Sequence, residues 1–196
     1  MTRMLPLRLV FSAADVRAAL KGWKTQHRLP VLPPPAQYSH VFQHPTERWF
    51  CFGDNSGRAY TSPFGHPGDR IWVREAWYST AALAGEFLGY VADPDHPHGQ
   101  TYYRRWASSM SRKNSRLTLE VLDVRVQRLS EMTVEEAHAE GCTIDLMDRE
   151  PDVTRPPLEE FARRWDRRYD NRLRNFTVLA DPVVWVCRFQ LLPLSR

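Results

Sequence analysis

The densest group of reactive side chains in this 196-residue sequence is the segment G-W-K-T-Q-H-R, residues 22–28. Lys24 supplies an amine, Thr25 a hydroxyl and His27 an imidazole, and the guanidinium of Arg28 follows. Groups of these types donate and accept protons and bind anions, which is the chemistry of an active site or of a nucleic-acid contact. The segment is therefore the first candidate for a functional site.

A second group mixes basic and aromatic side chains between residues 102 and 116. Cations neutralise phosphates and flat rings stack on bases, so this mixture suits contact with single-stranded or looped RNA. A flexible, solvated loop is the alternative interpretation. Arg28 and Arg74 are further candidates, because a guanidinium makes two parallel hydrogen bonds to phosphate or guanine. The candidate nucleic-acid contacts are Arg28, Arg74, Tyr103, Arg104, Arg105, Trp106, Arg112 and Lys113.

A third run of charge lies on the helix predicted after Pro156 and Pro157. Its arginines are interspersed with Glu159, Glu160 and Asp166, a pattern typical of a solvated, ion-paired helix face. We therefore interpret the run as a solvated, ion-paired face of the helix. The arginines are Arg163, Arg164, Arg167 and Arg168.

The composition is that of a globular protein with a small basic excess. Hydrophobic residues make up 42% of the chain and the net charge is +4, which excludes a wholly disordered chain and is compatible with an anionic partner. No apolar run approaches the ~20 residues of a membrane helix, and the N-terminal segment lacks the apolar region of a signal peptide. The cysteines and histidines lack metal-ligand spacing, and there is no phosphate-binding loop or dinucleotide fingerprint. We therefore expect a cytoplasmic protein with reduced thiols, no membrane contact, no metal and no cofactor.

The elements that position these residues are indicated by periodicity and capping signals. Ser12 with Asp15, and Thr133 with Glu136, form capping boxes at the starts of two helices, and a glycine ends each helix. A third helix begins after residue 157. Predicted strands cover residues 6–11, 48–52, 70–78, 86–91, 116–129 and 183–192.

The longest predicted strand changes phase in its middle. Apolar residues occupy positions 117, 119 and 121, and then positions 122, 124 and 126. A β-bulge produces such a change and bends the strand, and the alternative is two consecutive strands with a corner at Leu122. Both favour a curved sheet. We expect an α+β fold in a single domain over residues 1–196, a small, curved, mostly antiparallel β-barrel of about six strands flanked by about three helices.

Five motifs extend this picture over nearly the whole chain. They are GWKTQHR (22–28), PGDRIWVRE (67–75), RWAS (105–108), EEAHAEG (135–141) and VWV (184–186). In these motifs and their order the chain resembles the ASCH domain family, and within it the longer proteins of phages and prophages. The resemblance implies a barrel related to the PUA domain of RNA-modifying enzymes, with a pocket for a nucleobase or a nucleic-acid end. Relative to small family members, the chain carries inserted loops at about 29–66 and 79–115.

The resemblance also implies site residues. Some small ASCH proteins are N4-acetylcytidine amidohydrolases, whose active site combines a Lys of the G-x-K segment, a Thr three residues later and a Glu of the helix after the long strand. Lys24 matches the Lys and Glu140 the Glu, whereas the Thr position falls on His27. Thr25 supplies a hydroxyl nearby. The candidate catalytic residues are therefore Lys24, Thr25, His27 and Glu140, with Lys24 as base and Glu140 as acid.

Two kinds of alternative stay open. Lys24 and Glu140 form either part of a reactive site or an ion pair that ties two helices together. The expected function is a nucleic-acid-associated ASCH protein that binds RNA or a modified nucleoside in the barrel cleft and hydrolyses an N4-acyl cytidine-type amide. The alternatives are a non-catalytic RNA- or DNA-binding regulatory module of phage type and a ribonuclease, the latter an activity attributed to another ASCH protein.

Overall fold

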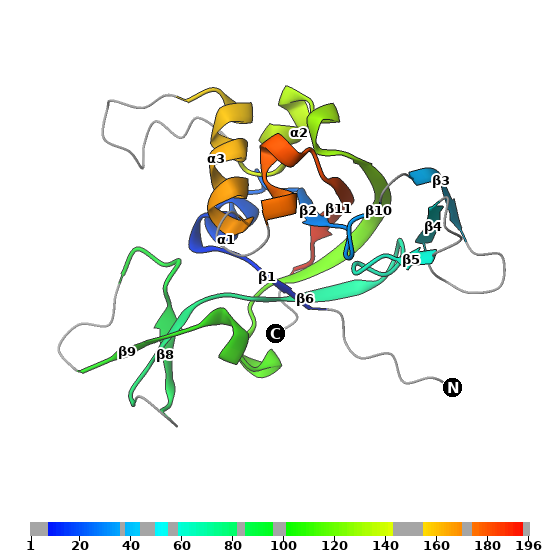
Figure 1. Ribbon diagram of the computed structural model, residues 1–196. Helices are drawn as coiled ribbons and strands as arrows, with labels where there is room; N and C mark the ends of the chain where they lie inside the picture. The colour runs from blue at the N-terminus through cyan, green and yellow to red at the C-terminus, as the bar shows by residue number, and fades with distance from the viewer. Residues whose placement is uncertain are drawn as a thin grey trace, which may run out of the picture.

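The computed structural model describes residues 8–35, 38–43, 50–54, 59–81, 85–95, 101–142, 155–169 and 174–193. These residues form one five-stranded sheet, two three-stranded sheets and three α-helices, so the expected α+β class is confirmed (Figure 1). Within the same ranges, no helix has both the length and the apolar character needed to cross a membrane.

The elements have the following bounds. The helices are α1 (Ala13–Leu20), α2 (Val134–Ala139) and α3 (Pro157–Tyr169). The large sheet contains β1 (Arg8–Val10), β2 (Gln26–Pro30), β6 (Arg70–Arg74), β10 (Thr118–Arg128) and β11 (Val183–Leu191). One small sheet contains β3 (Tyr38–Gln43), β4 (Phe50–Asp54) and β5 (Ala59–Thr61), and the other contains β7 (Trp77–Ser79), β8 (Phe87–Tyr90) and β9 (Tyr103–Arg105). Short 3-10 turns, η1 (Ala107–Ser109) and η2 (Arg112–Asn114), follow β9.

The large sheet has the strand order β1-β6-β10-β11-β2. Only the β1–β6 pairing is parallel, so the sheet is mostly antiparallel, as expected. The register of β10 against β11 shifts between Val121 and Asp123, which confirms the bulge that the change of phase predicts. The long strand β10 is strongly curved (Figure 1). Because β1 and β2 are the two edges, the described part of this sheet is open and does not form a closed barrel.

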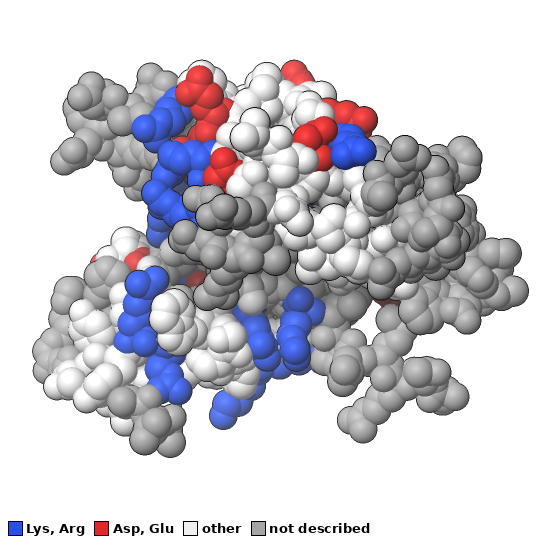
Figure 2. Space-filling model, viewed as in Figure 1, with Lys and Arg blue, Asp and Glu red and all other residues white. Residues whose placement is uncertain are grey.

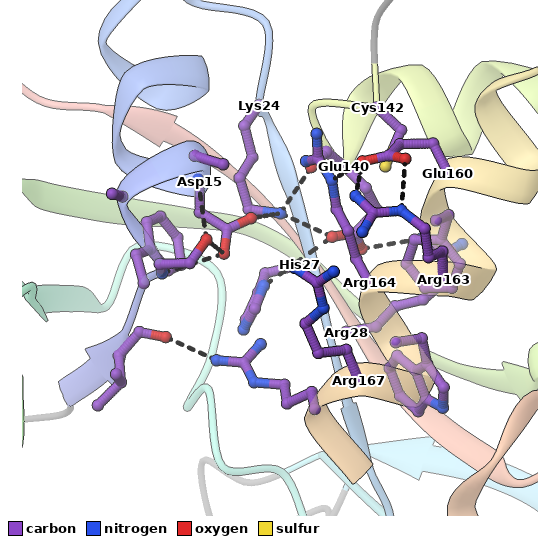
Figure 3. A pocket seen from close by; sticks show the side chains of 18 residues that line it. Asp15, Lys24, His27, Arg28, Glu140, Cys142, Glu160, Arg163, Arg164 and Arg167 are labelled. Carbon is purple, nitrogen blue, oxygen red and sulfur yellow. Dashed lines mark hydrogen bonds and ion pairs between the residues drawn. The ribbon is translucent and has the colours of Figure 1, made fainter. Parts of the chain in front are cut away.

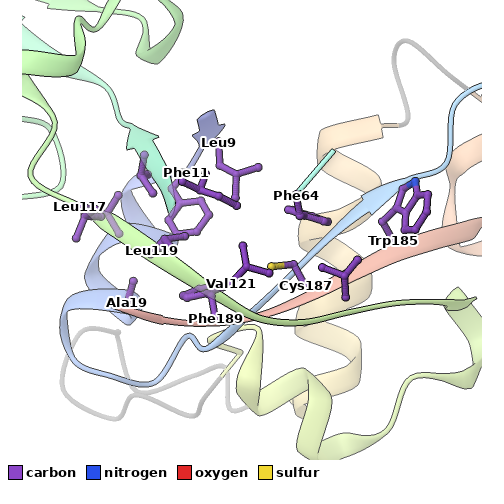
Figure 4. Close-up of a cluster of buried hydrophobic side chains, with 14 of the residues drawn as sticks. Leu9, Phe11, Ala19, Phe64, Leu117, Leu119, Val121, Trp185, Cys187 and Phe189 are labelled. Atoms are coloured by element: carbon purple, nitrogen blue, oxygen red, sulfur yellow. The ribbon is translucent and has the colours of Figure 1, made fainter. Parts of the chain in front are cut away.

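Strand β11 is buried on both faces, as befits an interior strand. Alternate residues of a strand point to opposite sides. Trp185 and Phe189 join the main core with Phe11 (Figure 4), whereas Val184 and Val186 face a second cluster formed with α2 and α3. This second cluster attaches α3 to the sheet and thereby fixes one wall of the site described below.

Both predicted capping boxes are formed. Ser12 Oγ accepts a hydrogen bond from the Asp15 N–H at 3.1 Å, and the Asp15 carboxylate accepts one from the Ser12 N–H. Thr133 and Glu136 make the same exchange at the start of α2. Each box satisfies N–H groups that have no partner within the helix, which explains why these two helices begin where the sequence indicates.

The two segments that the resemblance implies as insertions contain strands, of which β4 and β8 lie at the predicted strands 48–52 and 86–91. Residues 29–66 include the whole β3–β4–β5 sheet, and residues 79–115 include β8 and β9, which pair with β7. The predicted strand 70–78 is divided, because β6 stays in the large sheet and β7 enters a small one. Aromatic packing supports this small sheet, since the rings of Trp77 and Phe87 are stacked 5.9 Å apart. The sequence pattern did not indicate β3, nor β5 and β9, and these last two have only three residues each, which is too short to show a period.

Candidate functional site

A cavity of about 530 Å³ lies between α1 and α3 (Figure 3). Its walls come from the end of β1, the first turn of α1, the segment 24–28 that leads into β2, the residues after α2, and α3. The volume lies within the range of about 300–1,000 Å³ found for small-molecule sites. Of the residues singled out as catalytic or nucleic-acid contacts, those that line it are Lys24, His27, Arg28 and Glu140.

Lys24 and Glu140 form a buried ion pair in the cavity wall. Lys24 Nζ donates to Glu140 Oε2 at 2.7 Å and to the Glu140 carbonyl oxygen at 2.9 Å. Arg28 Nη1 donates to the other carboxylate oxygen, Oε1, at 2.9 Å. The ion pair weighed as an alternative is therefore present, and it faces the cavity. Since both oxygens of Glu140 accept from cationic donors, the carboxylate holds Lys24 and Arg28 in place.

Each buried cation has a second carboxylate. Asp15 Oδ1 lies 3.4 Å from Lys24 Nζ, and Glu136 Oε2 accepts from Arg28 Nη2 at 2.7 Å. Burial opposes ionisation of Asp15, but Lys24 and the Ser12 hydroxyl outweigh it and hold the pKa of Asp15 below its ordinary value of 3.8. Burial likewise opposes ionisation of Glu136, whose pKa is nevertheless lowered by Arg28. The inner wall is thus a network of compensated charges.

Main-chain contacts bring these distant parts of the sequence together. The Thr25 N–H donates to the last carbonyl of α2 at 2.8 Å, and Lys24 and Glu140 form an isolated antiparallel bridge. Gly141 follows with a φ of +82°, and a Cβ there would lie 2.8 Å from the Ala18 Cβ and 3.2 Å from the Lys24 Cβ. Only glycine permits so close an approach, so the Glu-Gly end of α2 seats Lys24 against Glu140.

His27 lies at the floor of the cavity and is 2% exposed. Neither ring nitrogen has a hydrogen-bond partner among the described residues, and Nδ1 is 3.9 Å from Glu140 Oε2. The rings of Phe11 and Phe64 surround it at centroid distances of 5.1 and 6.3 Å. Burial, reinforced by the charge of Lys24, lowers the pKa of His27 well below 6.5, so the imidazole is neutral at physiological pH. It offers one donor and one acceptor to the cavity.

The arginines of α3 also line the cavity. Arg163 and Arg164 are ion-paired with Glu160, and Arg167 and Arg168 are exposed, so the face is ion-paired and solvated as interpreted, and it also borders the cavity. Phe161 and Trp165 dock α3 against the sheet, and this packing brings the arginines opposite the first turn of α1 (Figure 3). Helical periodicity shows which residues share a face, but it does not show what that face meets in the folded chain.

Thr25 is not part of the cavity. Its side chain is exposed, while those of Lys24, Gln26 and His27 are buried. The Thr25 hydroxyl therefore does not face the cavity with the other candidate catalytic residues, whereas His27 does.

The remaining candidate nucleic-acid contacts lie away from the cavity. Arg74 ends β6, and the others follow one another along β9, η1 and η2. Trp106 is 82% exposed and Tyr103 is 42% exposed. Arg116, from the same basic segment, turns inward instead and donates to both carboxylate oxygens of buried Glu75 at 2.9 and 3.0 Å. The outer residues of the segment form a surface separate from the cavity.

Asp15 and Glu136 are site residues that the sequence indicated only as helix caps. Each carboxylate serves its own helix through the capping box and also faces a buried cation, Lys24 or Arg28. The capping box already accounts for each carboxylate, so the sequence gives no sign that the same carboxylate has a second partner in the folded chain. The one hint is that Asp15 stands where a capping box usually has Glu or Gln.

Cys142 also faces the cavity but is not a ready nucleophile. Burial raises the pKa of its thiol to about 11, so the thiolate is scarce at neutral pH. Within the ranges that the structure describes, no three His, Cys, Asp or Glu side chains are grouped so that they could hold a metal ion. The chemistry of the site therefore has to be sought in His27, Lys24 and the charged groups around them.

Comparison with known proteins gives no match for this chain among protein-family models, curated proteins or solved structures.

Proposed function

We propose that the chain binds a nucleobase in the cavity and hydrolyses an N4-acyl cytidine-type amide there, as an ASCH-type protein. His27 carries the proposal, because it is a buried, neutral imidazole without a described partner at the floor of a 530 Å³ cavity. Leaving a buried polar group without a hydrogen bond costs about 1–3 kcal/mol. A ligand that satisfies both ring nitrogens recovers this free energy, so the cavity favours a ligand with adjacent donors and acceptors.

Nucleobases have this property. Enzymes that act on a base read the hydrogen-bonding edge of the extruded base and hold its faces between aromatic or apolar side chains. The cavity combines His27 with Phe11 and Phe161 in its lining. The neutral ring of His27 can donate from one nitrogen to an acceptor atom of the base and accept from a water molecule with the other, which an imidazolium cannot do.

In the proposed hydrolytic step, His27 acts as the general base and Lys24 stabilises the oxyanion. His27 accepts a proton from water as the water oxygen attacks the acyl carbonyl carbon, and its low pKa keeps it unprotonated beforehand. Lys24, held by Glu140, donates to the developing oxyanion. The tetrahedral intermediate then loses its bond to N4, and the imidazolium returns the proton to the leaving nitrogen. The products are a carboxylic acid and the free amino group of cytidine.

This assignment of His27 as the general base differs from the expectation from the sequence, in which Lys24 is the base and Glu140 the acid. Lys24 Nζ donates to two oxygen atoms of Glu140, and both carboxylate oxygens of Glu140 accept from cations. His27 is the group at this wall that still has a nitrogen lone pair to offer.

A PUA-like barrel belongs to the same proposal. It is supported by a curved, mostly antiparallel sheet with a bulge in β10. It is also supported by the meeting of two of the five ASCH-like motifs, residues 22–28 and 135–141, at one cavity wall.

A second candidate function is binding of a nucleic-acid strand without chemistry. Exposed aromatic residues Tyr103 and Trp106 stand among basic residues on β9, η1 and η2, a combination that favours stacking on bases and contact with phosphates. Figure 2 shows Lys and Arg gathered over the β8 and β9 region as well as over α3. The proposed contact residues are Tyr103, Arg104, Arg105, Trp106, Arg112 and Lys113.

The test is incubation of the purified protein with N4-acetylcytidine and chromatography of the products. Wild type and the control Arg104→Gln, on exposed β9, are expected to release acetate and cytidine. His27→Gln is expected to lose about 10²–10⁴-fold in rate, the usual contribution of a general base. Circular dichroism checks that each variant is folded.

Three other results are informative. Binding of N4-acetylcytidine without turnover rejects the hydrolytic step and leaves binding without chemistry as the function. Cleavage of single-stranded RNA that disappears in His27→Gln identifies a ribonuclease instead. If the protein neither binds nor hydrolyses N4-acetylcytidine, the nucleobase cavity is rejected.

A further inference from the structure

We infer that the arginines of α3 form a phosphate-binding site at the mouth of the cavity, so that the ligand is a nucleotide or strand end with a terminal phosphate. The inference rests on the proposed function, which places the base at His27, and it identifies the second group that the ligand carries. The phosphate-site residues are Arg163, Arg164, Arg167 and Arg168.

The lining of the cavity has an excess of positive charge. Six Lys and Arg side chains face three Asp and Glu side chains, and His27 is neutral. At the floor the charges are compensated, because Lys24 and Arg28 are bonded to Glu140 and to a further carboxylate each. The uncompensated charge therefore lies on α3, over which Figure 2 shows a concentration of Lys and Arg.

Glu160 fixes two of these arginines. Its buried carboxylate accepts from Arg163 Nε and Nη2 at 3.0 and 2.8 Å, and from Arg164 Nε at 2.7 Å. Arg164 Nη1 also reaches the Gly141 carbonyl at 3.3 Å. One carboxylate thus orients two guanidinium groups and leaves net positive charge, which is a preorganised arrangement for an anion.

The other two arginines have no carboxylate partner among the described residues. Arg168 Nη2 donates to the neutral Val10 carbonyl at 2.9 Å. Among the residues that the structure describes, Arg167 makes no hydrogen bond or ion pair. Both are exposed, which places them at the opening of the cavity. After burial and Lys24, the charge of Arg168 contributes to the low pKa of His27, so its field reaches the floor.

This cluster opposes local stability. Like charges three or four residues apart destabilise a helix, and α3 has three such pairs, Arg163 with Arg167, Arg164 with Arg167 and Arg164 with Arg168. A bound dianion removes that repulsion. Guanidinium groups bind phosphate oxygens through paired, charge-assisted hydrogen bonds, so the residue type also suits the ligand.

A second observation points to a ligand in the same cavity. Arg28 is 1% exposed, and its Nε has no partner among the residues described. Together with both nitrogens of His27, it is an unsatisfied buried group in the cavity lining. The base meets these groups at the floor, the phosphate meets α3 at the mouth, and the sugar lies between them.

The experiment compares ligand binding by calorimetry at low salt. The probes are cytidine, cytidine 5′-monophosphate, inorganic phosphate, and an oligocytidylate with and without a 5′-phosphate. The variants are wild type, the double variant Arg167→Gln/Arg168→Gln, and the control Arg188→Gln, an exposed arginine of β11 that belongs neither to the cavity nor to the proposed nucleic-acid surface. The contact of Arg168 with the Val10 carbonyl of β1 is exposed, so the double variant is expected to remain folded, and circular dichroism checks this.

The inference predicts that the monophosphate binds wild type about tenfold or more tightly than cytidine does, as a charged hydrogen bond contributes. The double variant is expected to lose this difference while binding cytidine as before, and the control to keep it. Preference for the phosphorylated oligocytidylate over the mononucleotide identifies a strand end as the ligand, and the reverse preference identifies a free nucleotide.

Two outcomes overturn the inference separately from the proposed function. If cytidine and its monophosphate bind equally, or if the double variant keeps the difference, the base site stands and the phosphate site falls. If no probe binds, or if inorganic phosphate binds as tightly as the monophosphate, the base site falls and the inference falls with it.

Discussion

Replacing Glu140 by Gln tests the charge network that shapes the cavity. Glu140→Gln keeps the shape of the side chain but removes the charge that Lys24 and Arg28 share, and these two cations are only 2% and 1% exposed. Breaking a buried ion pair by removing one partner costs about 3–5 kcal/mol. Lys24 keeps Asp15 at 3.4 Å and Arg28 keeps Glu136 at 2.7 Å, which places the expected loss near the lower limit, about 3 kcal/mol.

The assay is urea unfolding followed by tryptophan fluorescence. In a parallel thermal unfolding experiment on a chain of this length, a loss of about 3 kcal/mol is expected to lower the melting temperature by about 6–12 °C. Glu159→Gln, an exposed acid on α3, serves as the matched control and is expected to change little. The double variant Lys24→Met/Glu140→Gln is expected to lose less than the sum of its single variants, because it removes the stranded cation. A Glu140→Gln protein as stable as the control would refute the reasoning.

Three further predictions concern the backbone, the pH dependence and the outer surface. Gly141→Ala is expected to cost about 1–3 kcal/mol in unfolding free energy, because its Cβ meets the Ala18 Cβ at 2.8 Å and its φ is +82°; unchanged stability in urea would contradict this. The pKa of His27 is lower in the folded state than its ordinary 6.5, so the unfolded chain binds more protons below that pH and stability falls as the solution is acidified. His27→Gln is expected to flatten this dependence of unfolding free energy on pH below pH 6.5, and equal slopes for both proteins would argue against a neutral, buried ring. Arg104→Glu/Arg112→Glu is expected to weaken binding of single-stranded RNA and to reduce its salt dependence, as measured by fluorescence anisotropy, and unchanged binding would exclude this surface.

Local signals in the sequence predicted local structure well. The capping boxes at Ser12 and Thr133 are formed, and the change of phase at Leu122 is the bulge seen in β10. These features depend on neighbours within a few residues, so the sequence pattern contains the whole interaction. The position of Lys24 beside Glu140 was indicated only by the resemblance to the ASCH family, because 116 residues separate the two.

What the sequence did not show depends on tertiary contacts. The arginines of α3 are ion-paired or exposed, as their pattern indicates, but only the docking of Phe161 and Trp165 against the sheet shows that they also border a cavity. The sequence makes Thr25 and His27 equally good candidates for a catalytic role. Only the folded structure shows that the Thr25 side chain is exposed and the His27 side chain is buried. Short strands such as β5 and β9 are stabilised by pairing with neighbours and carry no period of their own.

The binding of a nucleobase by His27 is tested most directly by nitrogen NMR of protein labelled with ¹⁵N-histidine. The account predicts a neutral His27 ring at pH 7 whose two nitrogen resonances both shift when cytidine or N4-acetylcytidine is added, because each nitrogen gains a hydrogen bond. His27 resonances that stay unchanged at saturating nucleoside, or that already show an imidazolium, would contradict it.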